Sequence, residues 1–526
     1  MRFLDRDRSP RSTRWRVCGV IPLLVALLNI PLSVMGAAPA SVPELYAPVL
    51  PEERAAVIAA TDGQIDAYTL RVRLDPATSA IGGELAVSFT NQTVRPLTEV
   101  YFRLYPNAAY YAEGSLTIEA ATVAGERVEP ELQVGDTALR LPLGRVLPPG
   151  AAIALELVFS TVVPLDSGGS FGILNHASVE GTWVLADWYP IIAGYEQDTG
   201  WFLGAPTGLG DPTFAATALY DVSITAPGGL TVVASGSATG ETTVEPDGAL
   251  TQRYLTGPAR DFALIADEDF IATSVVVDGT TVTAYALPGG EVAAQLALST
   301  AVEALTHYNL WFGAYPFAEL DLAQSPLTGA LGLSWSGLIY LDANRYRGDP
   351  AAMSVVERDL LEFIVAHEVG HQWWGGSVGS NSNDHTFLVE SLTNYLSVAF
   401  VEEVRGAARG GAARDAMLVG PYLSLLGQGI DDVVDTPAAP DQESATRTTI
   451  VYSKGGLGFL AIRRAVGDDA FFTALASYAE THAFGVTDPD DLQGAFETAS
   501  GSDLDELWRV WFESAETTPD DVAALL

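Results

Sequence analysis

The sequence predicts an α+β fold in which strands come first along the chain and helices follow. Before about residue 270, apolar and polar residues alternate in short runs, which is typical of strands with one buried face. The clearest of these runs are residues 68–74, 84–89 and 221–225. Turn sequences rich in Pro and Gly separate them. We therefore predict an all-β domain over residues 39–270.

Beyond residue 270, after a few more strands, apolar residues recur at the spacing of an α-helix. The predicted helices are residues 292–312, 354–374, 386–404, 452–466, 471–482, 490–500 and 504–512, with a helical patch near 417–426. Residues 405–449 are rich in Gly, Ala, Pro and Asp, so we expect irregular helix and loop there. The acidic tail beyond Phe512 is expected to be loose. Residues 271–526 are thus predicted to form a second, mainly helical domain.

The charge of the chain is strongly negative. Among 526 residues, 66 are acidic and 27 are basic, which gives a net charge of −39. A surface of this sign repels a phosphate backbone, so we expect no nucleic-acid partner. At 48 % hydrophobic residues, the chain can bury a sizeable core.

The first forty residues have the composition of a targeting segment. Six Arg residues lie within the first sixteen positions, an apolar run spans residues 17–35, and small residues follow. This order is typical of a secretory signal. The run is also just long enough to cross a bilayer. We therefore predict that residues 1–38 are a signal peptide or an N-terminal membrane anchor, and that the protein is extracytoplasmic, either secreted or tethered through residues 17–35.

One short motif indicates a metal site. His367-Glu368-Val369-Gly370-His371 lies at the end of a predicted helix, where positions i and i+4 share a face. Both imidazoles can then bind one ion, with Glu368 beside them to activate water. The only cysteine is Cys18, so thiolate ligands are excluded from the body of the chain.

A third ligand is needed for a catalytic zinc site. Glu390 follows His371 after a gap of eighteen residues and lies in the next predicted helix, among apolar neighbours. An acidic residue on the inner face of a helix is costly unless it is paired or binds a metal. The sequence therefore predicts one Zn²⁺ held by His367, His371 and Glu390.

This arrangement resembles the aminopeptidase N family of gluzincin zinc metallopeptidases. The likeness extends beyond the zinc motif to the segments 312–317, 371–375, Asn383-Asp384 and 452–456. It implies a β-saddle domain followed by a thermolysin-like catalytic domain, and a short form without the long helical C-terminal domain of many members. It also implies a peptide or protein substrate, with Glu368 as general base and Tyr452 as hydrogen-bond donor to the oxyanion.

One departure from the family concerns substrate recognition. The family's Gly-x-Met-Glu-Asn strand, whose Glu binds the free amino terminus, corresponds here to Gly332-Leu333-Ser334-Trp335. Gly332 and Ser334 are the candidate substrate-binding residues. A neutral hydroxyl cannot pair with an ammonium as a carboxylate does, so recognition of a free amine is in doubt.

The remaining polar residues receive plainer interpretations. Lys454 is interpreted as a salt-bridging or snorkelling side chain, and Asn394 as a residue that orients a zinc ligand. We expect the other histidines to be ordinary packing or surface residues, namely His176, His307, His385 and His482. Two alternatives to a peptidase stay open, a non-catalytic metal-stabilised binding module and a metallohydrolase of a non-peptide substrate.

Overall fold

The structure is a computed structural model that describes residues 40–61, 65–111, 113–208, 213–346, 353–439 and 444–526. The predicted signal peptide or anchor over residues 1–38 lies outside these ranges, so it stays a prediction. Within the described ranges, none of the helices combines the length and apolar character needed to span a bilayer. Residues from Ala40 onward form one compact unit, and the boundary predicted at residue 270 also stays a prediction.

An eight-stranded sheet dominates the N-terminal region, in the order β16-β17-β14-β1-β2-β8-β4-β5. Along β1, buried residues alternate with more exposed ones, as the sequence pattern predicts. Tyr68, Leu70 and Val72 therefore point into one core. The strands are β1 (Asp66–Asp75), β2 (Ala80–Thr90), β4 (Ser115–Val123), β5 (Glu126–Arg127), β8 (Ala152–Val162), β14 (Ala218–Ala226), β16 (Ser237–Val244) and β17 (Leu250–Ala259).

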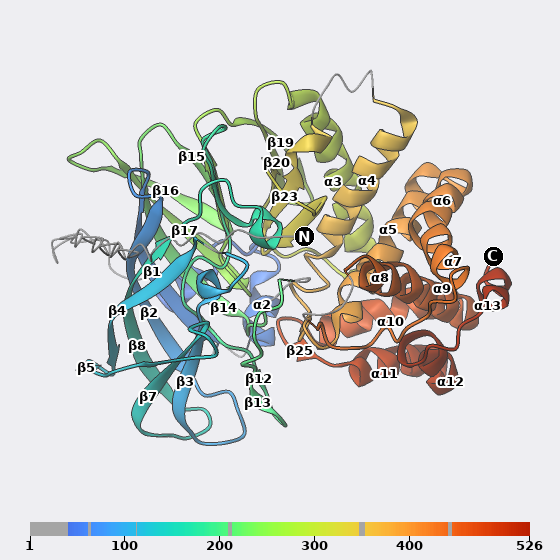
Figure 1. Ribbon diagram of the computed structural model, residues 1–526, viewed down its shortest axis with the longest axis horizontal. Coiled ribbons are helices and arrows are strands. Elements are labelled where there is room, and N and C mark those ends of the chain that lie inside the picture. Colours follow the sequence, from blue (N-terminus) through green and yellow to red (C-terminus); the bar gives the residue numbers. More distant parts are fainter. Residues whose placement is uncertain (1–39, 62–64, 112, 209–212, 347–352, 440–443) are drawn as a thin grey trace, which may run out of the picture. The chain divides into compact units, whose positions relative to one another are not determined.

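Two four-stranded sheets and one short hairpin complete this region. Their orders are β15-β18-β10-β9 and β11-β3-β7-β6, and β12 pairs with β13. Their inner faces share the core of the large sheet, so the strands of Figure 1 pack as layers around one apolar interior. The strands are β3 (Leu97–Arg103), β6 (Glu131–Gln133), β7 (Ala138–Leu147), β9 (Leu174–Ala177), β10 (Thr182–Leu185), β11 (Ile191–Ile192), β12 (Tyr195–Glu196), β13 (Gly200–Trp201), β15 (Thr231–Ala234) and β18 (Leu264–Asp267).

A five-stranded sheet opens the second region, in the order β19-β20-β21-β23-β22. The long helix α3 (Glu291–Phe312) packs against β19 and β20 and against the helix α4 (Val355–Gly370). In this order β22 is an edge strand. The strands are β19 (Ile271–Val277), β20 (Thr280–Ala286), β21 (Glu319–Ser325), β22 (Gly332–Trp335) and β23 (Leu338–Asp342).

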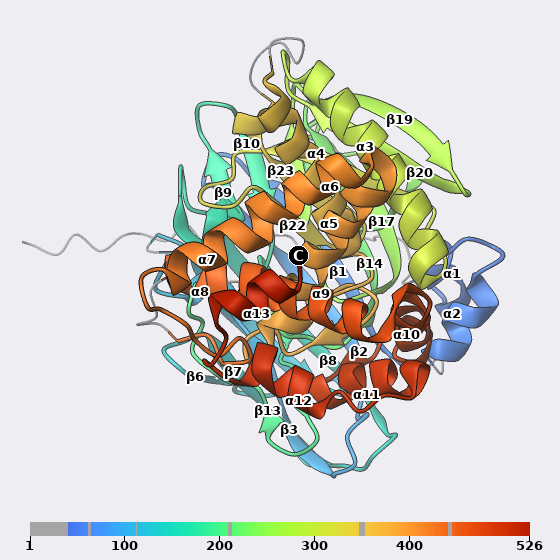
Figure 2. The ribbon, with the colours of Figure 1, turned by 90° about the vertical axis from the view of Figure 1, so that its right-hand side faces the viewer.

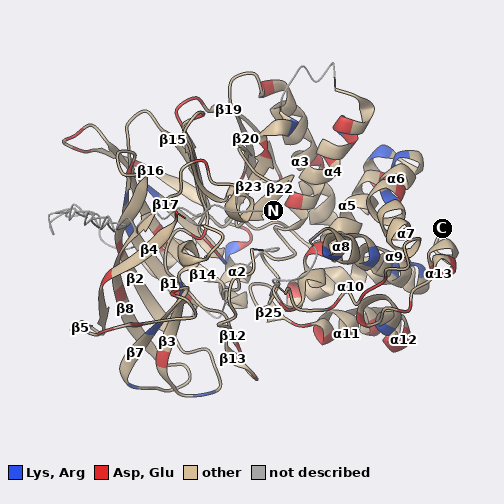
Figure 3. Cartoon of the chain, in the orientation of Figure 1, with Lys and Arg blue, Asp and Glu red and all other residues tan. Residues whose placement is uncertain are grey.

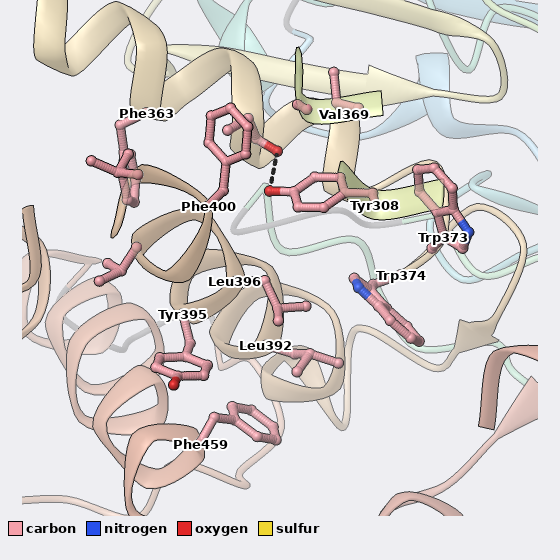
Figure 4. Close-up of a cluster of buried hydrophobic side chains, with 14 of the residues drawn as sticks. Tyr308, Phe363, Val369, Trp373, Trp374, Leu392, Tyr395, Leu396, Phe400 and Phe459 are labelled. Carbon is pink, nitrogen blue, oxygen red and sulfur yellow. Dashed lines mark hydrogen bonds between the residues drawn. The ribbon is translucent and has the colours of Figure 1, made fainter. Parts of the chain in front are cut away.

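The rest of the second region is helical, as Figure 2 shows from the side of these helices. Its core includes a cluster of aromatic and aliphatic side chains between α3, α4, α5 and α9. In Figure 4 the Tyr308 hydroxyl donates to the Ala366 carbonyl at 3.1 Å, so α3 fixes α4 one residue before His367. The helices are α5 (Glu390–Arg405), α6 (Ala407–Arg414), α7 (Gly420–Leu426), α8 (Ser444–Thr448), α9 (Gly455–Val466), α10 (Asp468–Thr481), α11 (Pro489–Ser500), α12 (Asp505–Trp508) and α13 (Pro519–Ala524).

Short pieces complete the described fold. Near the N-terminus lie α1 (Val42–Leu45) and α2 (Arg54–Ala60), and β24 (Gly379–Ser380) pairs with β25 (Val486–Thr487). Three segments are π-helices, η5 (Asp415–Val419), η6 (Thr449–Lys454) and η7 (Arg509–Glu513). Strands followed by helices make an α+β fold, which confirms the predicted class.

Two details of the sequence-based prediction are wrong. Tyr452 does not begin an α-helix, because it lies inside η6, which joins α8 to α9 without a break. The tail beyond Phe512 is not loose, because Thr518 caps α13 and Val522 is buried in the core of the helical region. Acidic residues lie along both regions in Figure 3, so charge alone was a poor guide to order in this tail.

Candidate active site

The helix α4 brings both histidines of the motif to one place. It begins at a capping box, in which Ser354 Oγ accepts from the Glu357 amide and the Glu357 carboxylate accepts from the Ser354 amide. His367 lies in its last turn and His371 at its C-terminal cap, so both imidazoles project from one face. Glu368, which is only 4 % exposed, lies between them in sequence.

Glu390 approaches these histidines from the first residue of α5. Its Oε2 atom lies 3.2 Å from His367 Nε2 and 3.5 Å from His371 Nε2, and the two Nε2 atoms are 3.0 Å apart. Ligands of a tetrahedral zinc bound at about 2.0–2.1 Å lie about 3.3 Å from one another. The three predicted ligand atoms therefore have the mutual spacing of a zinc site.

The donor set also fits zinc chemically. His371 Nδ1 donates to the Trp374 carbonyl at 3.0 Å, which fixes the ring and leaves Nε2 free to bind a metal. Two imidazole nitrogens that face each other at 3.0 Å need a proton or a cation between them. Two histidines and one carboxylate match the ligands of known catalytic zinc sites, so His367, His371 and Glu390 form a possible metal site.

Burial determines the protonation of these groups. Burial lowers the pKa of His367, which favours the neutral imidazole that a metal needs. Burial alone would lower the pKa of His371 too, but the charge of Glu390 and a hydrogen bond with it raise that pKa to about 9. Burial alone would raise the pKa of Glu390, and the two histidines reverse this so that its pKa falls below the usual range. Glu390 is therefore an anion.

Glu368 behaves differently from Glu390, although both are buried. Burial raises the pKa of Glu368 to about 8, because the charge of His371 only partly offsets the loss of water. A carboxyl group whose pKa lies near neutrality can both take up and release a proton. The two carboxylates thus have the environments expected of a metal ligand and of a general base.

The edge strand β22 lies directly against Glu368. A Cβ atom at Gly332 would be 2.5 Å from Glu368 Oε1, so only glycine lets the strand come this close. Ser334, two residues further on, accepts a hydrogen bond from Gln372 Nε2 at 2.7 Å. An edge strand can add an extended peptide as a further strand. Both predicted substrate-binding residues therefore lie on a strand that can bind a peptide next to the possible metal site.

Gln372 is a residue of this site that sequence reasoning missed. Besides Ser334, its amide nitrogen donates to the Trp335 carbonyl at 3.0 Å, and its Oε1 accepts from the Gly337 amide at 2.9 Å. One side chain thus fastens the β22–β23 turn to the residue after His371. The signals in the sequence were its position directly after the motif and its place in the segment 371–375, which resembles the family.

Tyr452 faces the same site from η6. Its ring lies 6.1 Å from the His367 ring, centroid to centroid, at an angle of 27°. Burial, followed by the charge of Glu390, raises the pKa of Tyr452 well above its usual value, so the hydroxyl keeps its proton. Tyr452 can therefore act as a hydrogen-bond donor beside the three ligand atoms.

Lys454 and Asn394 bond to protein groups outside the predicted ligand set. Lys454 is fully buried and donates to Asp431 Oδ1, the Asp432 carbonyl and the Ser514 carbonyl at 2.6–2.8 Å, as a salt-bridging lysine should. The interpretation of Asn394 was wrong, because the partner of its amide is the Tyr452 carbonyl and not a zinc ligand. The prediction failed because Asn394 lies one turn after Glu390, a position that suggested a contact with this ligand.

Arg260, at the end of β17, links the strand region to this site. Its guanidinium donates to the carbonyls of Gly376 at 2.8 Å and Ser377 at 3.1 Å, in the loop that follows α4. It also bonds to the Gly485 carbonyl. Sequence reasoning missed Arg260, because the sequence pattern of a strand does not show that an arginine at its end bonds to a distant loop.

Residues 296–511 match the peptidase family M1 domain. The match covers α4, α5 and η6, so every element of the possible metal site lies inside it. The match supports the predicted resemblance to the aminopeptidase N family.

Curated relatives agree with the M1 assignment. The chain is 27 % identical over 245 residues to aminopeptidase M1-B of Oryza sativa subsp. japonica, which covers 46 % of this chain and 28 % of that protein. It is 29 % identical over 233 residues to aminopeptidase N of Lactobacillus helveticus, which covers 41 % and 26 %. The chain thus spans between a quarter and a third of the length of these relatives.

Solved structures of the M1 fold resemble nearly the whole chain. The M1 zinc metallopeptidase from Deinococcus radiodurans aligns with a TM-score of 0.59 at 21 % sequence identity, covering 87 % of this chain and 94 % of that chain. Its E323A mutant aligns with a TM-score of 0.60. At this level of identity the likeness establishes the fold, which includes both the strand region and the M1 domain.

Proposed function

We propose that this protein is a zinc-dependent peptidase. The observation that carries the proposal is the convergence of His367, His371 and Glu390 on one point, with Glu368 beside them under the edge strand β22. A ligand set, a buried carboxyl base and a peptide-binding edge are the parts that metal-assisted hydrolysis requires. The M1 match and the names of the aminopeptidase relatives support the same reaction.

The roles of the residues follow from their surroundings. One zinc ion held by His367, His371 and Glu390 would supply a Lewis acid that acidifies water and polarises a carbonyl. Glu368 removes a proton from the attacking water and delivers it to the leaving amine, for which a pKa raised to about 8 is suited. The Tyr452 hydroxyl donates to the oxyanion that forms as the carbonyl is attacked.

The substrate is a peptide bound in extended form along β22. Backbone groups at this edge can pair with a peptide whatever its side chains. Ser334 supplies no charge for a free amino terminus, and its oxygen already accepts from Gln372. We therefore propose that residue 334 does not read a free amine, and that the enzyme accepts peptides with a blocked or internal amino end.

The test is cleavage of one peptide in two forms, free and N-acetylated, by the zinc-loaded protein, with Glu368→Gln as the blank. Cleavage of both forms supports the proposal. Cleavage of the free form alone, from its first residue, shows that another group reads the amine. If neither form is cut above the blank, peptide hydrolysis is wrong and a binding module or a hydrolase of other substrates is favoured.

We also propose that the protein is exported, on the composition of residues 1–38. Mass spectrometry of the mature N-terminus tests this. A chain that begins close to residue 39 indicates a cleaved signal, and an intact chain in the membrane fraction indicates an anchor through residues 17–35. An intact chain in the cytosol contradicts export.

A further inference from the structure

The backbone that carries Tyr452 is held by the helix that carries Glu390. Ser391 Oγ donates to the Val451 carbonyl at 2.6 Å, and Asn394 Nδ2 donates to the Tyr452 carbonyl at 2.8 Å. Ser391 is 0 % and Asn394 is 3 % exposed. The helix α5 thus carries the predicted metal ligand Glu390, and it also carries the two side chains that donate to consecutive carbonyls of η6.

The two carbonyls lie in η6, a π-helix whose hydrogen-bond spacing differs from that of the helices on either side of it. In a π-helix each amide bonds to the carbonyl five residues earlier, whereas the flanking α8 and α9 use a spacing of four. The hydrogen-bond register therefore shifts by one residue where the two forms meet. A shift of one residue leaves one carbonyl without a helical donor, and the two side chains of α5 donate at this place.

The approach of the two helices is close enough to require glycine. A Cβ atom at Gly455 would lie 2.2 Å from Ser391 Oγ. In the two residues before Gly455, Ser453 Oγ donates to the Met417 carbonyl at 2.8 Å, and Lys454 makes the three bonds described above. Residues 451–455 are therefore held from several sides, and the hydrogen bond from Asn394 is the one that reaches the backbone of Tyr452 itself.

We propose that Asn394 is a positioning residue for the Tyr452 hydroxyl, assisted by Ser391. The inference rests on the proposed function of Tyr452 as oxyanion donor. A tyrosine side chain turns about only two torsion angles, so the place of its hydroxyl depends on the place of its backbone. Because Glu390 and Asn394 belong to one helix, α5 sets the distance between the metal ligand and the oxyanion donor.

The kinetic test compares Asn394→Ala with Tyr452→Phe and with the double variant. Loss of an oxyanion donor lowers kcat by about 10²–10³-fold, so we expect Tyr452→Phe to fall in this range. Asn394→Ala should lower kcat about tenfold, leave KM within about twofold and keep one zinc per chain, as expected for an interaction made only in the transition state. In the Tyr452→Phe background, Asn394→Ala should cost nothing further.

Ser397→Ala is the matched control. Ser397 is a buried residue of the same helix, and its hydroxyl bonds within α5 to the Thr393 carbonyl at 2.8 Å. This variant should leave kcat unchanged. Equal losses from Asn394→Ala with and without the Tyr452 hydroxyl would overturn the proposal, as would loss of zinc from Asn394→Ala.

A second readout does not depend on turnover. With 3-fluorotyrosine placed at position 452, the ¹⁹F resonance of the zinc-loaded protein should shift or broaden in Asn394→Ala and stay in place in Ser397→Ala. An unchanged resonance in Asn394→Ala contradicts positioning by Asn394. If the wild-type protein cuts no peptide while this resonance shifts as expected, the positioning stands and the proposed function of the site fails.

Discussion

The strand region and the helical region place buried polar groups in different ways. In the strand region Asp66, at the start of β1, accepts from the Thr90 amide at the end of the neighbouring strand β2, at 2.8 Å. In the helical region Lys454 pairs with Asp431 and also donates to the Ser514 carbonyl, so one buried cation joins three segments. In a sheet, the backbone amides and carbonyls form hydrogen bonds with the neighbouring strands. Short helices leave backbone groups at their ends and turns without such partners, so side chains must bond to these groups.

This difference matters for the site. The segments around the possible metal site are held to one another by a few buried side chains: Gln372 holds β22, and Asn394 and Ser391 hold η6. The strand region reaches this framework through Arg260. Geometry at the site should therefore depend on polar residues of the helical core, and most polar residues of the sheets should matter only for stability.

The largest effect on stability is expected for Lys454→Met. The lysine is completely buried and all three of its N–H donors have acceptors. Removal of one partner from a buried charged pair costs about 3–5 kcal/mol, because Asp431 is left without its cation. Urea unfolding measures the change. A loss below about 1 kcal/mol would mean that the helical framework does not depend on this contact.

The corresponding test in the strand region is Asp66→Asn, followed against pH. Burial raises the pKa of Asp66 from 3.8 to about 7. Between these values the unfolded chain releases a proton that the folded chain keeps, so rising pH favours unfolding by up to about 1.4 kcal/mol per unit. The cost is absent below pH 4 and complete above pH 7.

Asn at position 66 removes this titration, so we expect the variant to be more stable than wild type at pH 8 and its free energy of unfolding to change less between pH 4 and 7. Equal pH profiles would show that Asp66 is ionised in the folded protein. Peptide cleavage should be the same in both proteins at 25 °C, since Asp66 lies outside the framework of the site.

A smaller effect, on catalysis, is expected for Gln372→Leu. Loss of its bonds to the β22–β23 turn frees the strand that lies against Glu368. We expect kcat/KM to fall about tenfold, or about 1.4 kcal/mol, mainly through KM, because binding of the peptide backbone is weakened. Steady-state kinetics on one peptide measures this.

Gln493→Leu serves as the control for that variant, since the amide of Gln493 bonds to Asp505 at 2.8 Å in an exposed part of α11. Its kinetics should match wild type. A change confined to kcat in Gln372→Leu would contradict a role for Gln372 in holding the peptide-binding edge.

The smallest effect is expected for Arg509→Ala. This side chain is 43 % exposed and pairs with Glu506 and Glu516 at 2.8 and 3.2 Å. Exposed ion pairs are screened by solvent and contribute little, so the free energy of unfolding should hardly change. Comparison of Arg509→Ala with Lys454→Met at equal salt then shows how much more a buried charge contributes to stability than a surface charge of the same region. A similar loss of stability in both variants would contradict this difference.

Some parts of the molecule could be predicted from the sequence, and others could not. Alternation along residues 68–74 predicts β1 because a sheet needs only one apolar face, and i, i+4 spacing predicts that His367 and His371 share a face. Glu390 was predictable because a lone acid in an apolar helix demands a partner. Gln372, Asn394 and Arg260 were not, because most of their partners are backbone atoms of other segments, which a sequence pattern does not reveal.

The central claim is that two buried glutamates of one site have separate tasks, Glu390 in holding the metal and Glu368 in moving the proton. The most direct measurement determines zinc content and peptide cleavage on the same samples of wild type, Glu368→Gln and Glu390→Gln. We predict that Glu368→Gln keeps one zinc per chain and loses about 10²–10⁴-fold in kcat, while Glu390→Gln loses the metal itself. Zinc loss in Glu368→Gln, or undiminished cleavage by it, would contradict the account.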